Sequence, residues 1–325
     1  MHLRMAAANP IRHVVIIVKE NHGYDNYFGA FPGGNGATMA HSPNPPPSDP
    51  DHRHAAWLTR DQTAPRVQFQ QGDIPKYWDL ATSYTLCDNY YTDVAGPSTP
   101  NHLMLIMADS PLVDNPKTSY RQNPGPPVYD QPSLPAQLDA AGLTWANYDG
   151  YAFEFIKYTA GKKKTWQQFA TDAASGSLPS VSWLYADEVL SEHPADTAAE
   201  KKAGAGDVTK GMQWTVDQVN AVMSSSLWQS SVVFVTWDDW GGWWDHVTPP
   251  ELEQWTDGTQ FRLGGRVGCL VISPYAKRGY VSHAQHSHVS LVRFCENTLG
   301  LQPLNARTTA SDGMDDCFDF SQIVG

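Results

Sequence analysis

The chain has 325 residues, of which 41% are hydrophobic and only 17% are charged, so it has enough apolar material for the core of a large α/β enzyme domain. Its formal net charge of -12 argues against nucleic acid or an anionic membrane surface as a partner, because both attract proteins mainly through Lys and Arg. No apolar run approaches the length of a transmembrane helix.

The first part of the chain alternates between strand and helix signals. Val14–Val18 is continuously apolar, which is typical of a strand covered on both faces. From Gly23 to about Asp51 the chain is rich in Pro, Gly and Asn, and we expect an irregular Pro/Gly-rich excursion around residues 30–65. "DIPKYWDLATSYTLCDNYY" then predicts a helix and a short strand, which lead into the turn "AGPSTPNH".

The second part continues this alternation. "PSLPAQLDAAG" predicts a helix with Ser133 as its N-cap and Gly142 as its stop, and "LTWANYDG" predicts the next strand. A further helix has an apolar face formed by Met212, Val216, Val219 and Met223. "SVVFVTWDD" and "VGCLVISPYA" predict buried strands, and "SHVSLVRFCENTLG" predicts a closing helix. This order predicts an α/β fold in which helices cover both faces of a largely parallel sheet.

The cysteines and the N-terminus give few constraints. Cys87, Cys269, Cys295 and Cys317 are widely spaced and form no CxxC pair. A thiolate zinc cluster is therefore not expected, and the spacing assigns no disulfide. The N-terminal "MHLRMAAANPIRH" lacks an apolar stretch long enough for a secretory signal, so we expect no signal peptide within this chain.

The chemically informative residues directly follow predicted strands. Glu20 and Asn21 follow the first strand, and Asp238 and Asp239 follow "VVFVT". Sites in such sheets collect at the carboxyl ends of strands, so these side chains are expected to lie together. Their oxygens suit a hard or borderline divalent cation, and adjacent carboxylates repel each other unless a cation lies between them. Such a cation would activate a hydroxyl as a nucleophile and neutralise a phosphoryl oxygen.

Further candidates stand beside turn or strand-end signals. The Gly-Pro turn presents the hydroxyls of Ser98 and Thr99. His193 in "SEHPAD" and His246 in "WDHV" are candidate acids, phosphate donors or ligands. Trp240 belongs to a group of four tryptophans around the acidic strand end. These rings either wall the site or offer a face to a choline-like cation or a sugar.

Taken together, the chain resembles the bacterial phosphoesterase family that holds non-haemolytic-type phospholipases C and acid phosphatases, within the alkaline phosphatase superfamily. The blocks that carry the resemblance follow the family's order: "HVVIIVKENHGYDNYFG", "DIPKYWDLATSYTLCDNYY", "GPSTPNHLM", "LPSVSWLYADEVLSEHP", "VVFVTWDDWGGWWDHVTPP", "GRVGCLVISPYAKRGYV" and "CFDFSQ". The resemblance implies a three-layer α/β/α sandwich, here in a single domain over residues 1–325, and a metal-dependent phosphoester hydrolase. It implies one or more divalent ions (Mg, Mn, Ca, Fe or Zn) held by Glu20, Asn21, Ser98, Asp238 and Asp239.

The same resemblance implies further roles. Ser98, directly after Gly-Pro, would attack phosphorus and form a phosphoserine that water hydrolyses. His193 and His246 would be catalytic. The expected substrate-binding residues are His52, His54, Asn101, His288 and Trp240. A small phosphorylated substrate or a phospholipid head group is the expected partner, and a secreted or periplasmic location is implied.

Departures from the family pattern bear on the substrate. Asn101-His102 stands where the family usually has Asn-Arg, and Ser287-His288 stands where it usually has Asp-His. Asp239 is often Glu in the phospholipases, and the chain is shorter than they are, so we expect a phosphomonoesterase of the acid phosphatase type. A phospholipase C or phosphodiesterase acting on phosphocholine-type lipids is the alternative. An alternative from another class is a non-catalytic protein that binds sugars or lipid head groups. A sulfatase is not favoured, because the sulfatase pattern C/S-x-P-x-R is missing its Arg in this sequence.

Overall fold

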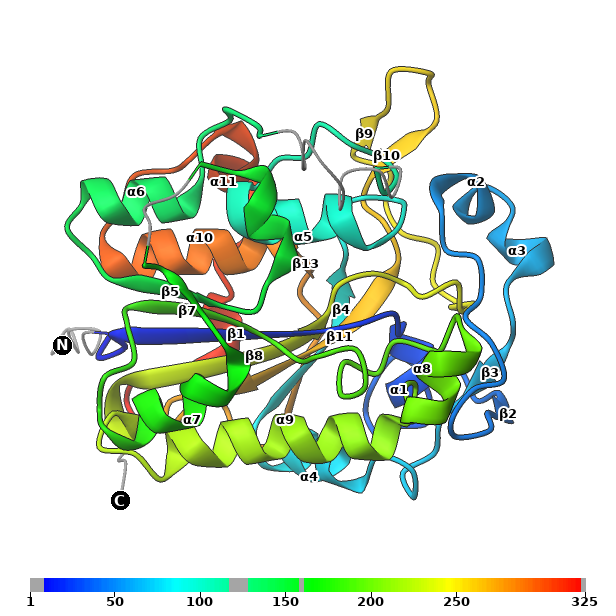
Figure 1. The fold of residues 1–325 in the computed structure, drawn as a ribbon, viewed down its shortest axis with the longest axis horizontal. Coiled ribbons are helices and arrows are strands. Elements are labelled where there is room, and N and C mark those ends of the chain that lie inside the picture. Colours follow the sequence, from blue (N-terminus) through cyan, green and yellow to red (C-terminus); the bar gives the residue numbers. More distant parts are fainter. Residues whose placement is uncertain (1–8, 117–127, 158–160, 323–325) are drawn as a thin grey trace, which may run out of the picture.

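The computed structural model describes residues 9–116, 128–157 and 161–322 of the chain. Among them, nine strands form one central sheet. Its order is β12 (Tyr280–Ser282), β4 (Thr85–Tyr91), β11 (Arg266–Ile272), β8 (Ser231–Trp237), β1 (His13–Lys19), β7 (Val181–Tyr185), β5 (Trp145–Tyr148) and β6 (Lys163–Lys164), and β13 (His286–Ser287) pairs with β4. Helices cover both faces, so the molecule has three layers (Figure 1). The α/β/α fold with a largely parallel sheet is thus confirmed.

Two helical layers enclose the sheet. One contains α5 (Ser98–Met107), α6 (Leu134–Ala140), α10 (His288–Leu299) and α11 (Ala306–Ala310), and the other contains α4 (Pro75–Ser83), α7 (Trp166–Ala174) and α9 (Val208–Met223) (Figure 1). The short helices are α1 (Tyr24–Phe28), α2 (His54–Trp57), α3 (Arg60–Thr63) and α8 (Ala198–Ala203), with 3-10 turns η2 (Tyr151–Phe155), η3 (Trp228–Ser230) and η4 (Asp315–Cys317). In the described parts of the chain, no helix combines the length and apolarity needed to cross a bilayer.

The register of the central strands determines which residues meet where these strands end. β1 runs parallel to both of its neighbours, and all seven residues of β8 are buried, which explains their continuous apolar runs. Lys19 of β1 pairs with Trp237 of β8, and the N–H of Asp238 donates to Lys19 O over 2.9 Å. The residues that follow these two parallel strands therefore lie side by side at the carboxyl ends of the strands.

The structure supplies one strand direction that the sequence did not specify, and it makes one expected turn shorter. β11 is antiparallel to both β4 and β8, because an apolar run shows burial but not direction. The turn that contains Gly96-Pro97 leads directly into α5, whose first residue is Ser98. Pro100 is compatible with this helix start because the first-turn N–H groups have no intrahelical partners.

The expected excursion around residues 30–65 contains more regular structure than its composition suggests. It includes the single turns α2 and α3, and β2 (Ala40–His41) pairs in parallel with β3 (Val67–Gln68). A second small sheet is formed by β9 (Glu253–Gln254) and β10 (Gln260–Arg262). These segments lie around the edge of the central sheet at which β1 ends (Figure 1).

Candidate functional site

The end of β1 brings Asn21 against the loop after β8. Asn21 has a left-handed backbone with a φ of 61°, a conformation that Asn adopts more readily than most residues. Its N–H donates to Asp238 Oδ1 over 2.9 Å. Gly241 also has a positive φ, and a Cβ atom on it would lie 1.8 Å from Asn21 O. Only glycine fits this position, and its close approach helps to hold Asn21 in place.

Ser98 begins α5 and faces the acidic strand end. Its Oγ donates to Asp239 Oδ2 over 2.9 Å and lies 3.5 Å from Asn21 Oδ1. The hydroxyl of Thr99 instead lies 3.0 Å from that of Tyr151. Ser98 is therefore the hydroxyl that the structure joins to the carboxylate pair, at the N-terminus of α5, where the positive end of the helix dipole favours an anion.

His102 lies one helical turn after Ser98 and is fully buried. Its Nε2 lies 3.2 Å from Asp238 Oδ2 and 3.4 Å from Glu20 Oε1. Burial alone would lower the pKa of His102, but Asp238 and Glu20 outweigh it and raise that pKa to about 10. The raised pKa of His102 favours its protonated form, whose positive charge offsets part of the negative charge at the strand ends.

A second polar group adjoins Asn21 and consists of Asp49, His52 and His193. Asn21 Nδ2 lies 3.3 Å from Asp49 Oδ1 and 3.4 Å from His52 Nε2. The rings of His52 and His193 lie 6.2 Å apart, centroid to centroid. Burial acts to lower the pKa of His193, but Asp49 and Glu20 raise it to about 9. This group therefore presents cationic imidazole to an anion beside Asn21.

The oxygen donors at the strand ends fit a divalent cation. Asp238 and Asp239 are adjacent, and both are 0% exposed. Burial, and then the negative charge of Asp238, raise the pKa of Asp239 to about 8. The positive charge of His102 therefore does not offset the negative charges of both Asp238 and Asp239. Carboxylate, amide and hydroxyl oxygens are the ligands that hard divalent ions take, and all three types meet here.

Two of the expected substrate residues position the backbone of this site. Asn101 Oδ1 accepts a hydrogen bond from Val94 N over 2.8 Å, and its Nδ2 donates to Pro97 O over 3.0 Å, which fixes the turn before α5. His288 is fully buried, and its Nε2 donates to the backbone oxygen of Asp238 over 2.7 Å. The side chains of both residues are occupied by these backbone contacts.

His54 and His246 are not brought to the acidic strand end, contrary to expectation. His54 lies 2.6 Å from Ala95 O through Nδ1 and 2.7 Å from Thr259 Oγ1 through Nε2. The Nδ1 of His246 lies 2.6 Å from Asp25 Oδ2. Their neighbours in sequence suggested a shared site, but their hydrogen-bond partners belong to other segments and do not include the strand-end carboxylates.

The tryptophans near the site are structural walls in this arrangement. Trp240 Nε1 donates to His52 O over 2.9 Å, and Trp243 Nε1 donates to Asn21 O over 3.0 Å. The exposed fractions of these two residues are only 2% and 4%. Their rings therefore support the loops that carry His52 and Asn21, and are too deeply buried to form a binding face for a choline-like cation.

Two residues of the site were not expected from the sequence, namely Asp49 and His102. The signal for His102 is its i,i+4 spacing from Ser98, which places both side chains on one helical face only once α5 is known to begin there. The signal for Asp49 is its position three residues before His52, within a stretch whose prolines suggested only an irregular loop.

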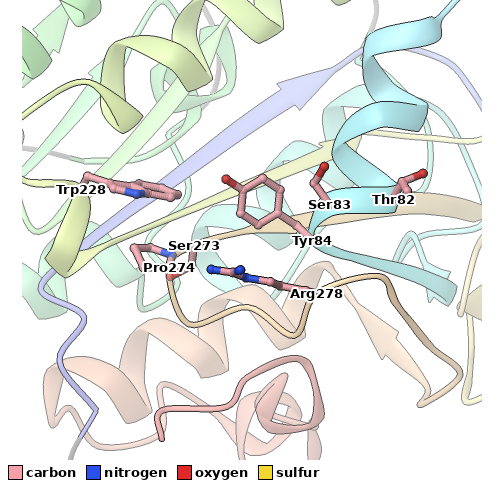
Figure 2. A pocket seen from close by; sticks show the side chains of 7 residues that line it. All are labelled: Thr82, Ser83, Tyr84, Trp228, Ser273, Pro274 and Arg278. Carbon is pink, nitrogen blue, oxygen red and sulfur yellow. The ribbon is translucent and has the colours of Figure 1, made fainter. Parts of the chain in front are cut away.

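Figure 2 shows a separate pocket. It is lined by Thr82, Ser83, Tyr84, Trp228, Ser273, Pro274 and Arg278. Tyr84 directly precedes β4, and η3, which contains Trp228, directly precedes β8. The pocket therefore borders the amino ends of these strands, whereas sites in α/β sheets form at the carboxyl ends, where Asp238 lies.

Sequence comparison gives a match to the phosphoesterase family over residues 44–163 and 150–302. The non-hemolytic phospholipase C of Pseudomonas aeruginosa is 27% identical, with 94% of this chain and 56% of that protein covered. Phospholipase C B of Mycobacterium tuberculosis is 26% identical, with 96% of this chain and 78% of that protein covered. The chain thus spans about half the length of the Pseudomonas protein and of a similar protein from Burkholderia pseudomallei, each covered over 56%.

Solved structures share the fold at much lower identity. The lipoteichoic acid synthase LtaP from Listeria monocytogenes has a TM-score of 0.52 at 12% identity, over 94% of this chain and 77% of that one. A protein in the alkaline phosphatase superfamily from Vibrio parahaemolyticus has a TM-score of 0.51 at 10% identity, over 95% of this chain and 70% of that one. The alkaline phosphatase-like fold implied by the sequence blocks is confirmed.

Proposed function

Because the chain belongs to the phosphoesterase family, we propose that it hydrolyses phosphoric esters through Ser98, with small phosphomonoesters as substrates. The observation that carries this proposal is the hydrogen bond of 2.9 Å from Ser98 Oγ to Asp239 Oδ2, which joins a hydroxyl to the carboxylate pair at the strand ends. The relatives named phospholipase C support the class of reaction.

The described contacts suggest how the residues would act. Ser98 Oγ would bond to phosphorus as the bond from phosphorus to the ester's alcohol oxygen breaks, and the Ser98 proton would pass to Asp239 Oδ2. His193, with its raised pKa, would give a proton to the departing oxygen. Water would then attack the phosphoserine and give a proton to His193, while Asp239 returns its proton to Ser98 Oγ as the bond from phosphorus to Oγ breaks, which releases inorganic phosphate and restores all three residues.

A divalent cation belongs to this proposal. Glu20, Asn21, Ser98, Asp238 and Asp239 would hold it, since the structure gathers oxygen donors from all three segments that carry these residues. When bound, the cation supplies positive charge that favours ionisation of a hydroxyl and neutralises phosphoryl oxygens. Two adjacent buried carboxylates are the feature of the donor set that most favours such charge.

The substrate preference rests on the cationic groups around Asn21. A phosphomonoester carries close to two negative charges at neutral pH, and His52 and His193 both have raised pKa values despite their burial. The N-terminus of α5 adds further preference for an anion. We keep a phospholipase C reaction as the second candidate because the relatives carry that name. The single domain and the secreted or periplasmic location stay predictions.

The test compares p-nitrophenyl phosphate with p-nitrophenyl phosphorylcholine, using metal-repleted protein. We expect the monoester to be turned over, and Ser98→Ala to lower kcat/KM by about 10³-fold or more. Thr99→Val is the matched control and should retain most of the activity, because its hydroxyl faces Tyr151. Turnover of the choline diester alone would replace the monoesterase by the phospholipase C candidate. No turnover of either ester by folded, metal-bound protein would favour the non-catalytic binding protein.

A further inference from the structure

Three segments that are distant in sequence bring two thiols and an imidazole together. Cys87 of β4, His286 of β13 and Cys317 of η4 each offer one ligand atom within 4.8 Å of the others. Their exposed fractions are 0%, 1% and 0%. Asp316, the residue before Cys317, completes what we call the thiol–imidazole cluster: Cys87, His286, Asp316 and Cys317. The spacing of the cysteines in the sequence had argued against such a cluster.

The distances in this cluster resemble those of a tetrahedral metal site. Zinc bonds of about 2.3 Å to sulfur and about 2.1 Å to nitrogen or oxygen imply about 3.8 Å between two sulfurs, about 3.6 Å between sulfur and oxygen, and about 3.4 Å between nitrogen and oxygen. The thiols of Cys87 and Cys317 lie 3.7 Å apart. Asp316 Oδ1 lies 3.6 Å from Cys317 Sγ and 3.2 Å from His286 Nε2. The separation of 4.0 Å between Cys317 Sγ and His286 Nε2 is longer than a zinc ion requires, and Asp316 is grouped by distance with His286 but not with Cys87, so the ligands have to close in around the ion.

Neighbouring groups orient the two ligands that are not thiols. Asp312 Oδ1 lies 2.6 Å from His286 Nδ1, so a carboxylate adjoins that side of the ring and Nε2 is the nitrogen nearest the thiol of Cys317. Asp316 Oδ2 accepts a hydrogen bond of 2.5 Å from Ser282 Oγ, which leaves Oδ1 on the side of the thiols. A carboxylate behind a histidine is the usual support of a metal ligand. Because Ser282 Oγ gives its proton to Asp316, it accepts from His286 Nε2 over 3.0 Å, and this proton has to leave before Nε2 binds a metal.

Neither a disulfide nor simple packing of buried thiols accounts for the cluster as well as a metal does. A disulfide needs sulfur atoms about 2.05 Å apart, well short of the distance between Cys87 and Cys317, and both cysteines are free. The ion pairs of His286 with Asp312 and Asp316 account for the two carboxylates, but not for the two thiols that meet beside this ring. The side chains of Asp312 and Asp316 are 39% and 28% exposed, so a cation can reach the otherwise buried cluster from this side.

We propose that Cys87, His286, Asp316 and Cys317 bind one zinc ion. Thiolate ligands select zinc over magnesium, calcium or manganese, and four protein ligands leave no open position, which indicates a structural site. The ion ties the C-terminal turn η4 to β4 and β13 of the central sheet. This site is independent of the oxygen-rich strand ends and of the reaction proposed for them.

The test loads the full chain with Co²⁺ in place of zinc and records its absorption spectrum. Cobalt bound to thiolate gives a charge-transfer band in the near ultraviolet, whereas cobalt held by oxygen ligands does not, so a metal at Asp238 and Asp239 does not interfere. We expect the band in the wild type and in the control Cys295→Ala, which removes another buried thiol, and its loss in Cys317→Ala. Zinc content after dialysis should fall by about one ion per chain in Cys317→Ala alone.

The wild-type spectrum decides the question even where Cys317→Ala fails to fold. Absence of a thiolate band from folded, cobalt-loaded wild type would overturn the proposal, as would a Cys87–Cys317 disulfide found by mass spectrometry in freshly isolated protein. Asp316→Asn keeps both thiols and nearly the same shape. We expect it to retain the band but to weaken cobalt binding by about 10-fold or more. Unchanged binding in this variant would remove Asp316 from the ligand set and overturn the four-ligand site.

Discussion

Lys19 and Glu192 form a fully buried ion pair, with 3.4 Å between Lys19 Nζ and Glu192 Oε1 and both side chains 0% exposed. Each residue directly precedes a member of the candidate site, since Glu20 follows Lys19 and His193 follows Glu192. The hydroxyl of Tyr77 also donates to Glu192 Oε1 over 2.6 Å. The pair therefore ties the end of β1 to the loop that carries His193.

Breaking this pair should destabilise the protein strongly. Glu192→Gln removes the nearest counter-charge of the buried Lys19 ammonium, and we expect it to lower the free energy of unfolding by about 3–5 kcal/mol. The double variant Lys19→Met/Glu192→Gln removes both charges and should cost clearly less than the sum of the two single changes. Urea denaturation of the wild type, of Lys19→Met, of Glu192→Gln and of the double variant measures this coupling. Strictly additive costs would show that the two charges do not interact.

The close approach of Gly241 to Asn21 gives a prediction with a matched control. Gly241→Ala introduces a Cβ 1.8 Å from Asn21 O, whereas Gly258 has a similarly positive φ but nothing within 4 Å of its hypothetical Cβ. We expect Gly258→Ala to cost about 1–2 kcal/mol of stability from its backbone conformation alone and to leave turnover unchanged. Gly241→Ala should cost more and also lower kcat, because it displaces Asn21. Equal effects of the two changes on kcat would contradict this role of Gly241.

Metal binding at the strand ends should be visible as a stability change. We expect Mn²⁺ to raise the Tm of metal-free protein, by an amount equivalent to about 2.7 kcal/mol when its free concentration is about 100 times the Kd. Mn²⁺ is chosen because it prefers oxygen ligands to thiolates. Asp239→Asn removes one carboxylate of the pair and should abolish most of the shift, while Asp257→Asn, whose carboxylate accepts from Thr259 Oγ1, should keep it. A full shift in Asp239→Asn would place the ion elsewhere.

The contribution of Glu253 to stability should depend on pH. Burial acts to raise its pKa, but the guanidinium groups of Arg307 and Arg262 outweigh it and lower the pKa to about 2. An unfolded Glu titrates near about 4.3, so this stabilisation is complete above that pH and is lost as the pH falls towards about 2. Glu253→Gln should therefore be less stable than the wild type at pH 7, with a difference that shrinks at pH 3. Urea denaturation at both values checks this, and a difference independent of pH would contradict it.

Part of the fold could be predicted because burial leaves a direct trace in the sequence. The continuous apolar runs of β1 and β8 and the spaced apolar face of α9 identified these elements, and Ser133 was recognised as the N-cap of α6, where it accepts from Ala136 N. The direction of β11 left no such trace, because a strand buried on both faces is equally apolar whether it runs parallel or antiparallel to its neighbours.

The site divides in the same way. The sequence alone determined that oxygen donors follow the strands at Glu20, Asn21, Asp238 and Asp239, because position after a buried strand is a local property of the chain. Only the tertiary structure decided that His102 lies between Glu20 and Asp238, and that Cys87 meets Cys317. These contacts depend on where α5 begins and on which strands lie side by side, and both result from packing between segments that are far apart in the chain.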